Sequence, residues 1–358
     1  MSRSKKPKQK KRKTSWIAFS VIVLALGFIV GPRLTELITG PPDFSGPGSG
    51  SVQIEVLEGD SIAKIGNVLK AAGVVKSVDA FTAAASANPD SKKIAPGFYE
   101  MLLGMRASDA IIRLLDPTAK VVYRVVIPEG KRAVDIYEIL SEATNIPVAQ
   151  FEQAANESDA LPLPSYANGN VEGFLFPATY EFPPTVTAQS ALIAMIEKFN
   201  AVSKQLNLEA LSTTTGRSVY EILTIASILE MEGTPADYRK VSRVVYNRLS
   251  LPMKLEFDST VNYGLGKTDV ILTTELLSQE NPYNSYLNFG LPPSPIGNPG
   301  VAAIEAALNP ENGDWIYFIT VNLETRETRF TSDYSEFLRW KDEFLAYCKQ
   351  KPEICYSK

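Results

Sequence analysis

Residues 218–233 read SVYEILTIASILEMEG, and this stretch decides how the second half of the chain folds. Apolar or small residues point in nearly every direction around a helix drawn through it: Ile222, Leu223, Ile225, Ala226, Ile228 and Leu229. A helix that is apolar on all sides is a buried helix. The pattern therefore predicts a helix enclosed by a folded domain, with few solvent-exposed positions for charged side chains.

Glu230 stands at the C-terminal end of this predicted helix. Gly233, three residues on, suits the left-handed position at which helices commonly stop. Apolar surroundings and the partial negative charge of a helix C-terminus both raise the pKa of a carboxyl group. A glutamic acid that keeps its proton near neutral pH can act as a general acid. The alternative is that Glu230 is a solvated charge at a helix end. Glu232 points about 200° further round, so we expect it to face solvent.

The rest of the chain predicts an α+β fold. Helical patterns follow the buried stretch and precede it, at residues 187–206, 236–250, 301–308 and 333–348. Strand-like stretches lie between the helices, at residues 179–182, 315–322 and 325–330, and the last two suggest a hairpin. Residues 290–300, GLPPSPIGNPG, form a Pro/Gly-rich loop of the kind that shapes a binding surface.

The N-terminus predicts a membrane anchor. Residues 1–14 are strongly basic, and residues 15–32, SWIAFSVIVLALGFIVGP, carry no charge. At about 1.5 Å per residue the apolar stretch is close to the thickness of a hydrocarbon core. The basic arm places the N-terminus in the cytoplasm, and a cleaved signal peptide is the competing interpretation. We expect a single-pass protein of the cell membrane whose catalytic domain is extracytoplasmic.

Residues 33–51, rich in Gly, Pro and Ser, predict a flexible spacer. Residues 52–120 then form a first folded unit. Its opening, VQIEVLEGDSIAKIGNVL, aligns at a constant offset of 71 with YRVVIPEGKRAVDIYEIL, which starts at residue 123. A strand ending in Glu-Gly, a loop and a helix thus occur twice. The unit resembles LysM-type glycan-binding modules, and residues 121–146 form a second β-α element at the start of a catalytic domain over 121–358.

Composition excludes several kinds of chemistry. The sequence has no histidine and two cysteines, so Ser-His-Asp and Cys-His catalysis and HExxH zinc sites cannot form within it. Acid/base chemistry must fall to Asp, Glu, Lys or Tyr, and we expect no metal and no cofactor. The net charge is −4 despite the basic arm, and an acidic body argues against a nucleic-acid partner. Cys348 and Cys355 either form a disulfide or remain two thiols on the C-terminal tail.

Several motifs occur in an order that is similar to one known family. LTIASILEMEG is followed by SRVVYNRL, LEFDSTVNYGLG, PYNSY, GLPPSPIGNPG and AALNP, and preceded by IPEG and EGFLFPATYEF. This arrangement resembles the MltG-type (YceG-like) endolytic murein transglycosylases over the whole region that follows the apolar segment. The resemblance implies that Glu230 is the catalytic residue. It implies active-cleft or substrate-binding positions at Glu172, Asn247, Asp258, Tyr283, Asn284 and Tyr286.

Each of those positions also has a structural interpretation. Asn247 can cap or pair on a helix, Asp258 can cap a turn, and the tyrosines can pack as core aromatics whose hydroxyls are bonded. The chain also departs from the family pattern. Glu256 replaces an amide and Ser259 a proline. Arg329 stands where the family carries a histidine, and residues 336–338 replace a late Glu-His-Asn.

The resemblance implies an enzyme that cuts the bond between N-acetylmuramic acid and N-acetylglucosamine and leaves 1,6-anhydromuramyl ends. One carboxylate suffices, because the C6 hydroxyl of the sugar is an intramolecular nucleophile. The expected partners are peptidoglycan strands, the membrane and peptidoglycan synthases. Two alternatives stay open: a hydrolytic muramidase with Asp258 or Glu172 as second carboxylate, and a non-catalytic peptidoglycan-binding scaffold.

Overall fold

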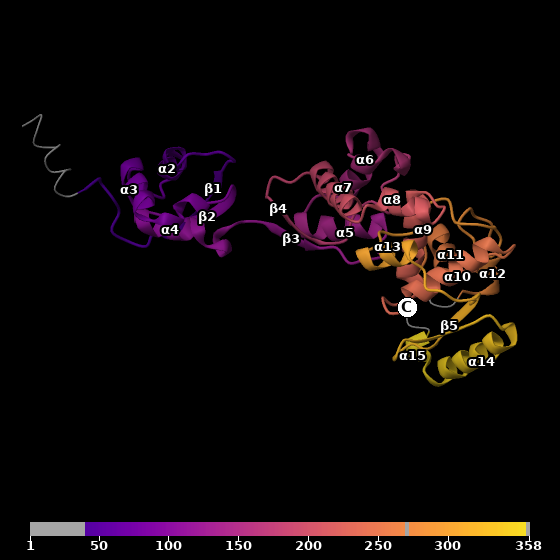
Figure 1. The fold of residues 1–358 in the computed structure, drawn as a ribbon. Helices are drawn as coiled ribbons and strands as arrows, with labels where there is room; N and C mark the ends of the chain where they lie inside the picture. Colours follow the sequence, from indigo (N-terminus) through magenta and orange to yellow (C-terminus); the bar gives the residue numbers. More distant parts are fainter. Residues whose placement is uncertain (1–39, 269–271, 356–358) are drawn as a thin grey trace, which may run out of the picture. The chain divides into compact units, whose positions relative to one another are not determined.

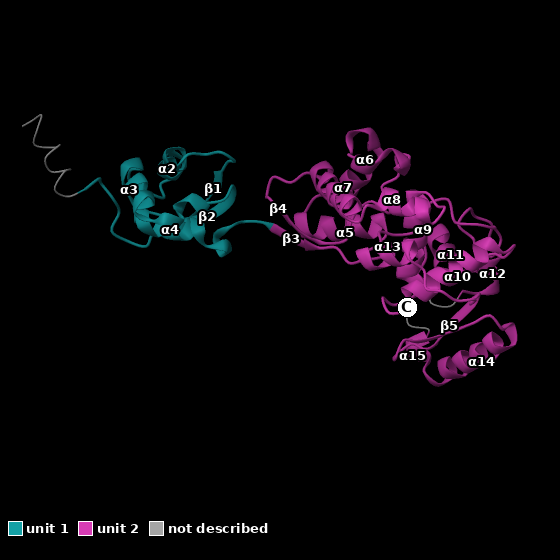
Figure 2. Cartoon of the chain, viewed as in Figure 1, with its two compact units in different colours: residues 1–122 teal, residues 123–358 magenta. Residues whose placement is uncertain are grey.

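The computed structural model describes residues 40–268 and 272–355, which divide into two compact units (Figure 2). Unit 1 extends to Val122 and unit 2 begins at Tyr123. The predicted anchor at residues 15–32 lies outside the described residues. Within the described ranges, no helix combines the length and apolar character needed to cross a membrane.

Unit 1 contains a two-stranded antiparallel sheet covered by helices (Figure 1). The elements are β1 (Ser49–Val56), α2 (Ile62–Ala71), α3 (Val78–Ala87), β2 (Gly97–Leu103) and α4 (Ala107–Leu115). Ser61 and Ser77 cap α2 and α3 by accepting hydrogen bonds from the backbone of the first turn. Leu69, Phe81 and Met101 are fully buried between the sheet and the helices. Glycan binding by this unit stays a prediction.

Part of the predicted spacer is bonded to unit 1. The carboxylate of Asp43 accepts hydrogen bonds from the backbone N–H of Ala107, the first residue of α4. The carbonyl of Pro42 accepts a bond from the Ser77 hydroxyl, and the carbonyl of Gly46 accepts one from the Arg106 N–H. A flexible linker makes no such bonds, so the folded unit starts before residue 52. Asp43 supplies a negative charge at a helix N-terminus, where it is stabilising.

Unit 2 begins with the second β-α element. Strand β3 (Tyr123–Val126) pairs antiparallel with β4 (Thr179–Phe182). The sheet packs with three helices, α5 (Ala133–Thr144), α6 (Val148–Asn156) and α7 (Ala188–Gln205). The predicted repeat is confirmed at the level of structure, because the Gly after each Glu turns the chain at positive φ, +78° at Gly59 and +76° at Gly130.

The centre of unit 2 is the helix predicted from residues 218–233. Helix α9 (Val219–Glu232) is surrounded by other helices: α8 (Leu208–Thr214), α10 (Tyr238–Ser250), α11 (Asp258–Leu265) and α13 (Val301–Leu308), with α12 (Thr274–Leu277) beyond α11. Every residue from Ile222 to Leu229 is buried. The all-round apolar pattern therefore marked the core correctly.

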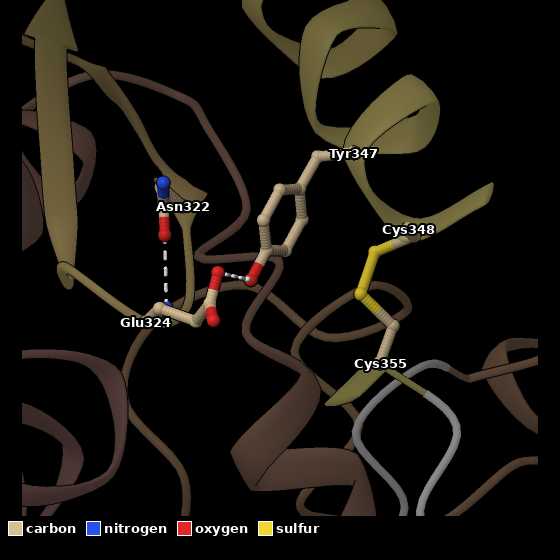
Figure 3. Close-up of a disulfide and its surroundings, with 5 residues drawn as sticks. All are labelled: Asn322, Glu324, Tyr347, Cys348 and Cys355. Carbon is tan, nitrogen blue, oxygen red and sulfur yellow. Dashed lines mark hydrogen bonds between the residues drawn. A yellow bond between two sulfur atoms is a disulfide. The ribbon is translucent and has the colours of Figure 1, made fainter. Parts of the chain in front are cut away.

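A hairpin and two helices complete unit 2. Strand β5 (Tyr317–Asn322) pairs antiparallel with β6 (Glu327–Thr331), and α14 (Tyr334–Gln350) packs on both strands. Cys348, near the end of α14, forms a disulfide with Cys355 in α15 (Pro352–Cys355) (Figure 3). Of the two possibilities left open for these cysteines, the structure has the disulfide. Next to it, the Tyr347 hydroxyl donates to the carboxylate of Glu324.

We predict that Leu223→Ala lowers the free energy of unfolding of unit 2 by about 2–5 kcal/mol, because it leaves a cavity in a side-chain cluster that cannot easily collapse. Leu251→Ala removes the same atoms from a side chain that is 45% exposed, whereas Leu223 is 0% exposed. Leu251→Ala is therefore the matched control, and it should lower the free energy of unfolding by well under half as much. Urea unfolding followed by tryptophan fluorescence measures both, since Trp315 and Trp340 lie in unit 2. Equal losses would contradict the central position of α9.

Candidate active site

Helix α9 is fixed at both ends. Ser218 and Glu221 form a capping box at the start, each side chain accepting a hydrogen bond from the backbone N–H of the other. The helix ends at Glu232, followed by Gly233 with φ −140° and ψ −174°. The expectation of a left-handed glycine here is wrong, because the chain leaves the helix in an extended conformation. Glu230 therefore lies in the last turn, with its backbone still helical.

Both carboxylate oxygens of Glu230 accept hydrogen bonds from other segments. Oε1 accepts a bond of 2.8 Å from the backbone N–H of Gly300, in the loop before α13. Oε2 accepts a bond of 2.6 Å from the hydroxyl of Tyr238, the first residue of α10. The side chain is half-buried. Glu230 is thus held in one orientation while part of it remains open to solvent, so it is not the freely solvated charge of the alternative interpretation.

Burial raises the pKa of Glu230, because the charged form loses hydration. The hydrogen bonds from Tyr238 and Gly300 oppose this effect by stabilising the anion. The nearby carboxylate of Glu129 adds to it through like-charge repulsion. The net direction is upward, which favours the protonated form that a general acid needs.

Glu172 lies elsewhere in unit 2, where it joins three segments. It is 5% exposed. Its carboxylate accepts bonds from the N–H of Ala133 at 3.0 Å, from Asn298 Nδ2 at 2.8 Å and from the Tyr263 hydroxyl at 3.1 Å. Burial raises the pKa of Glu172 to about 7. These bonds cap the start of α5 and give Glu172 a role in holding the loops together; contact with substrate stays a prediction.

Glu232 is half-buried and bonded to α11, so the expectation that it faces solvent is wrong. Its Oε1 accepts a 2.5 Å bond from the Ser259 hydroxyl and a 3.3 Å bond from the Ser259 N–H. Burial and, to a smaller extent, the neighbouring charge of Asp258 raise the pKa of Glu232 against the opposing bonds from Ser259, and the net pKa is about 7. The helical angle was correct, but α11 covers that side of α9. Ser259, which replaces the family's proline, supplies the N–H and the hydroxyl that bind the carboxylate.

At the other predicted site positions, the polar side-chain groups form hydrogen bonds within the protein. Tyr286 donates to Asp258 Oδ1 at 2.7 Å, next to Glu232. The hydroxyls of Tyr283 and Ser294 are bonded to each other at 2.8 Å. The buried Asn284 donates to the carbonyls of Leu277 and Gln279, and Asn247 donates to those of Gly313 and Trp315.

Asp258, Tyr286 and Glu232 are therefore brought together, whereas Glu230 has partners that the sequence prediction did not include. Those partners are Tyr238, Gly300 and Glu129, and the fully buried Asn298 joins the loops of Glu129 and Gly300. Glu129 and Gly300 stand inside the motifs IPEG and GLPPSPIGNPG, which could have pointed to them; nothing in the sequence distinguishes Tyr238. Among the residues that the structure describes, no group of three or more acidic or cysteine side chains could hold a metal ion.

A model of the YceG-like family matches residues 54–343, most of both described units. The chain belongs to the YceG-like family. A relative from Bacillus subtilis (strain 168), named endolytic murein transglycosylase, is 31% identical over 317 residues, covering 84% of this chain and 87% of the relative. A protein of the same name from Streptococcus pneumoniae (strain R6) is 30% identical over 306 residues. That match covers 75% of this chain and 54% of the relative, so the chain spans about half of the pneumococcal protein's length.

A solved structure agrees with this assignment. The crystal structure of a putative YceG-like protein from Listeria monocytogenes superimposes with a TM-score of 0.56 and 27% sequence identity, covering 82% of this chain and 99% of that one. The family resemblance predicted from ordered motifs is therefore confirmed.

We predict that Glu232→Gln flattens the pH dependence of stability of this YceG-like protein. Unfolded glutamate titrates near 4.5, whereas the pKa of Glu232 in the fold is about 7. Between these values the folded chain keeps a proton that the unfolded chain loses, so the free energy of unfolding falls as the pH rises through this window. The amide oxygen of glutamine can accept the same bonds from Ser259 but carries no charge.

Urea unfolding at pH 5 and pH 8 tests this effect. The free energy of unfolding of the wild type should fall from pH 5 to pH 8, and that of Glu232→Gln should fall less. The decline that persists in the variant comes from other groups with a raised pKa, such as Glu172. Glu138→Gln, on the exposed side of α5, is the matched control and should behave like the wild type. An unchanged decline in Glu232→Gln would show that Glu232 is already ionised in the fold.

Proposed function

We propose that this YceG-like protein is an endolytic peptidoglycan lytic transglycosylase with Glu230 as its acid and base. It cleaves the β-1,4 bond between N-acetylmuramic acid and N-acetylglucosamine, leaves 1,6-anhydromuramyl ends and thereby terminates the elongation of nascent strands. The observation that carries the proposal is the half-buried carboxyl of Glu230, whose pKa is raised and whose orientation is fixed by Tyr238 and Gly300. The relatives named endolytic murein transglycosylase support the reaction class.

The first step uses the protonated form of Glu230. The carboxyl group donates its proton to the oxygen between the two sugars, the bond from that oxygen to the anomeric carbon breaks, and the N-acetylglucosamine side leaves as an alcohol. Positive charge then develops at the anomeric carbon. The hydrogen bonds from Tyr238 and Gly300 stabilise the carboxylate that forms in this step, so that the proton can leave an otherwise desolvated group.

The second step returns the proton. The C6 hydroxyl of the muramyl sugar attacks its own anomeric carbon, a new C6–oxygen–C1 bond closes the anhydro ring, and Glu230 accepts the hydroxyl proton. Since the nucleophile belongs to the same sugar, its effective concentration replaces the activation of a water molecule. The carboxyl group ends the cycle protonated, and no other proton carrier is needed.

The muramidase alternative assigned the second carboxylate to Asp258 or Glu172. Asp258 accepts a bond from Tyr286, and Glu172 is bonded to three segments around the start of α5. Neither is bonded to Glu230, whose hydrogen-bond partners are Tyr238 and Gly300. This arrangement supports the transglycosylase over the muramidase with those residues.

Localisation and partners complete the proposal. The apolar segment at residues 15–32 anchors the chain in the cell membrane, with the N-terminus in the cytoplasm and both folded units outside. The disulfide between Cys348 and Cys355 supports an oxidising compartment, where such bonds persist. Unit 1 binds the glycan strand as a LysM-like module, and peptidoglycan synthases supply the strand.

We expect Glu230→Gln to lower the rate of cleavage of uncrosslinked glycan strands by about 10²- to 10⁴-fold, the usual contribution of an acid/base group. Chromatography of the released fragments measures the rate. Glu197→Gln, an exposed position of α7, makes the same chemical change away from the site and should keep the wild-type rate. A Glu230→Gln variant that is as stable and as active as the wild type would contradict the assignment. Strand binding without turnover in the wild type would favour the scaffold.

A further inference from the structure

We propose that Glu129 is a second carboxylate of the active site, and that its negative charge stabilises the positive charge that develops on the muramyl sugar beside Glu230. The inference rests on the proposed function, because it assigns a role within that reaction. It comes from the placement of the loop between β3 and α5, which contains residues 127–132. Sequence reasoning assigned Glu129 no role in the chemistry.

The loop that carries Glu129 is fixed to the loop before α13 by one buried residue. The Gly130 N–H donates to the carbonyl of Asn298 at 2.9 Å. The backbone N–H and the side-chain Nδ2 of Asn298 both donate to the carbonyl of Lys131, each at 2.9 Å. Asn298 Oδ1 accepts from the N–H groups of Gly173 and Leu175. Three of the bonds of this 0% exposed residue hold the segment directly after Glu129, and the others join it to Glu172 and to residues 173 and 175.

Glu129 and Glu230 both contact Gly300. The Gly300 N–H donates to Glu230 Oε1 at 2.8 Å. A Cβ atom built on Gly300 would stand 1.9 Å from Glu129 Oε1, so the second carboxylate lies directly against the Cα of the same residue. On the other side, a Cβ on Gly130 would lie 3.3 Å from the Cβ of Glu230. Two close backbone approaches therefore place two acidic side chains next to each other, and glycine at both positions makes room for them.

The groups that face Glu230 come from three neighbouring segments. Tyr238 contributes a hydroxyl from α10, and Gly300 contributes an N–H from the loop before α13. Glu129 contributes a negative charge, which acts on both Glu230 and Tyr238. The positive charge of Arg132, in the same loop as Glu129, acts instead on Glu172, and its guanidinium donates to the carbonyl of Lys267.

Glu230 and Glu129 lie in different environments, and this difference gives the two carboxyl groups different roles. Glu230 is half-buried and shielded by α10, whereas Glu129 is exposed, so that water hydrates its charge. Two neighbouring acids in unlike environments commonly divide into a proton donor and an anion. In the reaction described above, Glu129 exchanges no proton and forms no bond. It lowers the energy of the positively charged sugar, and its repulsion helps Glu230 to remain protonated until the substrate takes the proton.

The test compares the pH dependence of kcat/KM on uncrosslinked strands for the wild-type full-length chain and two variants. Glu129→Gln removes one negative charge and keeps the shape of the side chain, and we expect kcat/KM to fall by about 10- to 100-fold. Its basic limb, which reports the loss of the Glu230 proton, should move to lower pH. Tyr238→Phe removes a bond that stabilises the Glu230 anion, and should move the same limb to higher pH. A purely structural role for Glu129 would lower the rate without moving the limb.

Glu138→Gln, an exposed position of α5, is the charge-matched control and should reproduce the wild-type profile. A Glu129→Gln profile that is unchanged in height and in pH, while Glu230→Gln is inactive, would overturn the role of Glu129 and leave the proposed function intact. An inactive wild type would overturn the proposed function itself. A lower rate with an unmoved basic limb would also overturn the inference, because it would mean that the two carboxyl groups are not coupled.

Discussion

The burial of α9 from Ile222 to Leu229 is the constraint on which unit 2 depends. Eight consecutive residues from Ile222 to Leu229 are buried, and α8, α10, α11 and α13 all pack around them. A carboxyl group at the end of such a helix cannot be fully hydrated, and it needs hydrogen bonds from whatever covers it. Glu230 and Glu232 meet that need differently. One is bonded to α10 and the loop before α13 and stays partly open, while the other is bonded to Ser259 of α11.

The loops around Glu230 are held by buried polar groups as well as by apolar side chains such as Ile127 and Ile296. Asn298 and Glu172 bond to each other at 2.8 Å, and together they tie the start of α5, the segment around Gly173 and the loop before α13. Buried networks of this kind keep a fixed geometry when every member is bonded. The family motifs EGFLFP, IPEG and GLPPSPIGNPG thus meet at one place. Their glycines allow backbone to approach backbone and carboxylate closely.

Much of the fold could be predicted from the sequence, because periodicity and turn residues report local structure. The five helices expected in unit 2 and the strands at 179–182 and 315–322 were confirmed to within a few residues. What sequence could not show was which segments cover α9. The direction in which Glu232 leaves the helix was predicted correctly. Its exposure was not, because α11 packs on that side of α9. Glu230 was predicted from its motif and its buried helix, whereas Tyr238 approaches it from a separate helix and left no local signal. Gly233 is extended rather than left-handed, with φ −140° and ψ −174°.

The central claim is that one carboxylate acts first as an acid and then as a base toward a nucleophile that belongs to the substrate. The measurement that tests it most directly is digestion of uncrosslinked strands by the wild-type protein in ¹⁸O-labelled water, followed by mass spectrometry of the new ends. The account predicts anhydromuramyl ends without label, because the attacking oxygen is the sugar's own C6 hydroxyl. Reducing ends that carry one labelled oxygen would contradict it, since they would mean that water attacks the anomeric carbon.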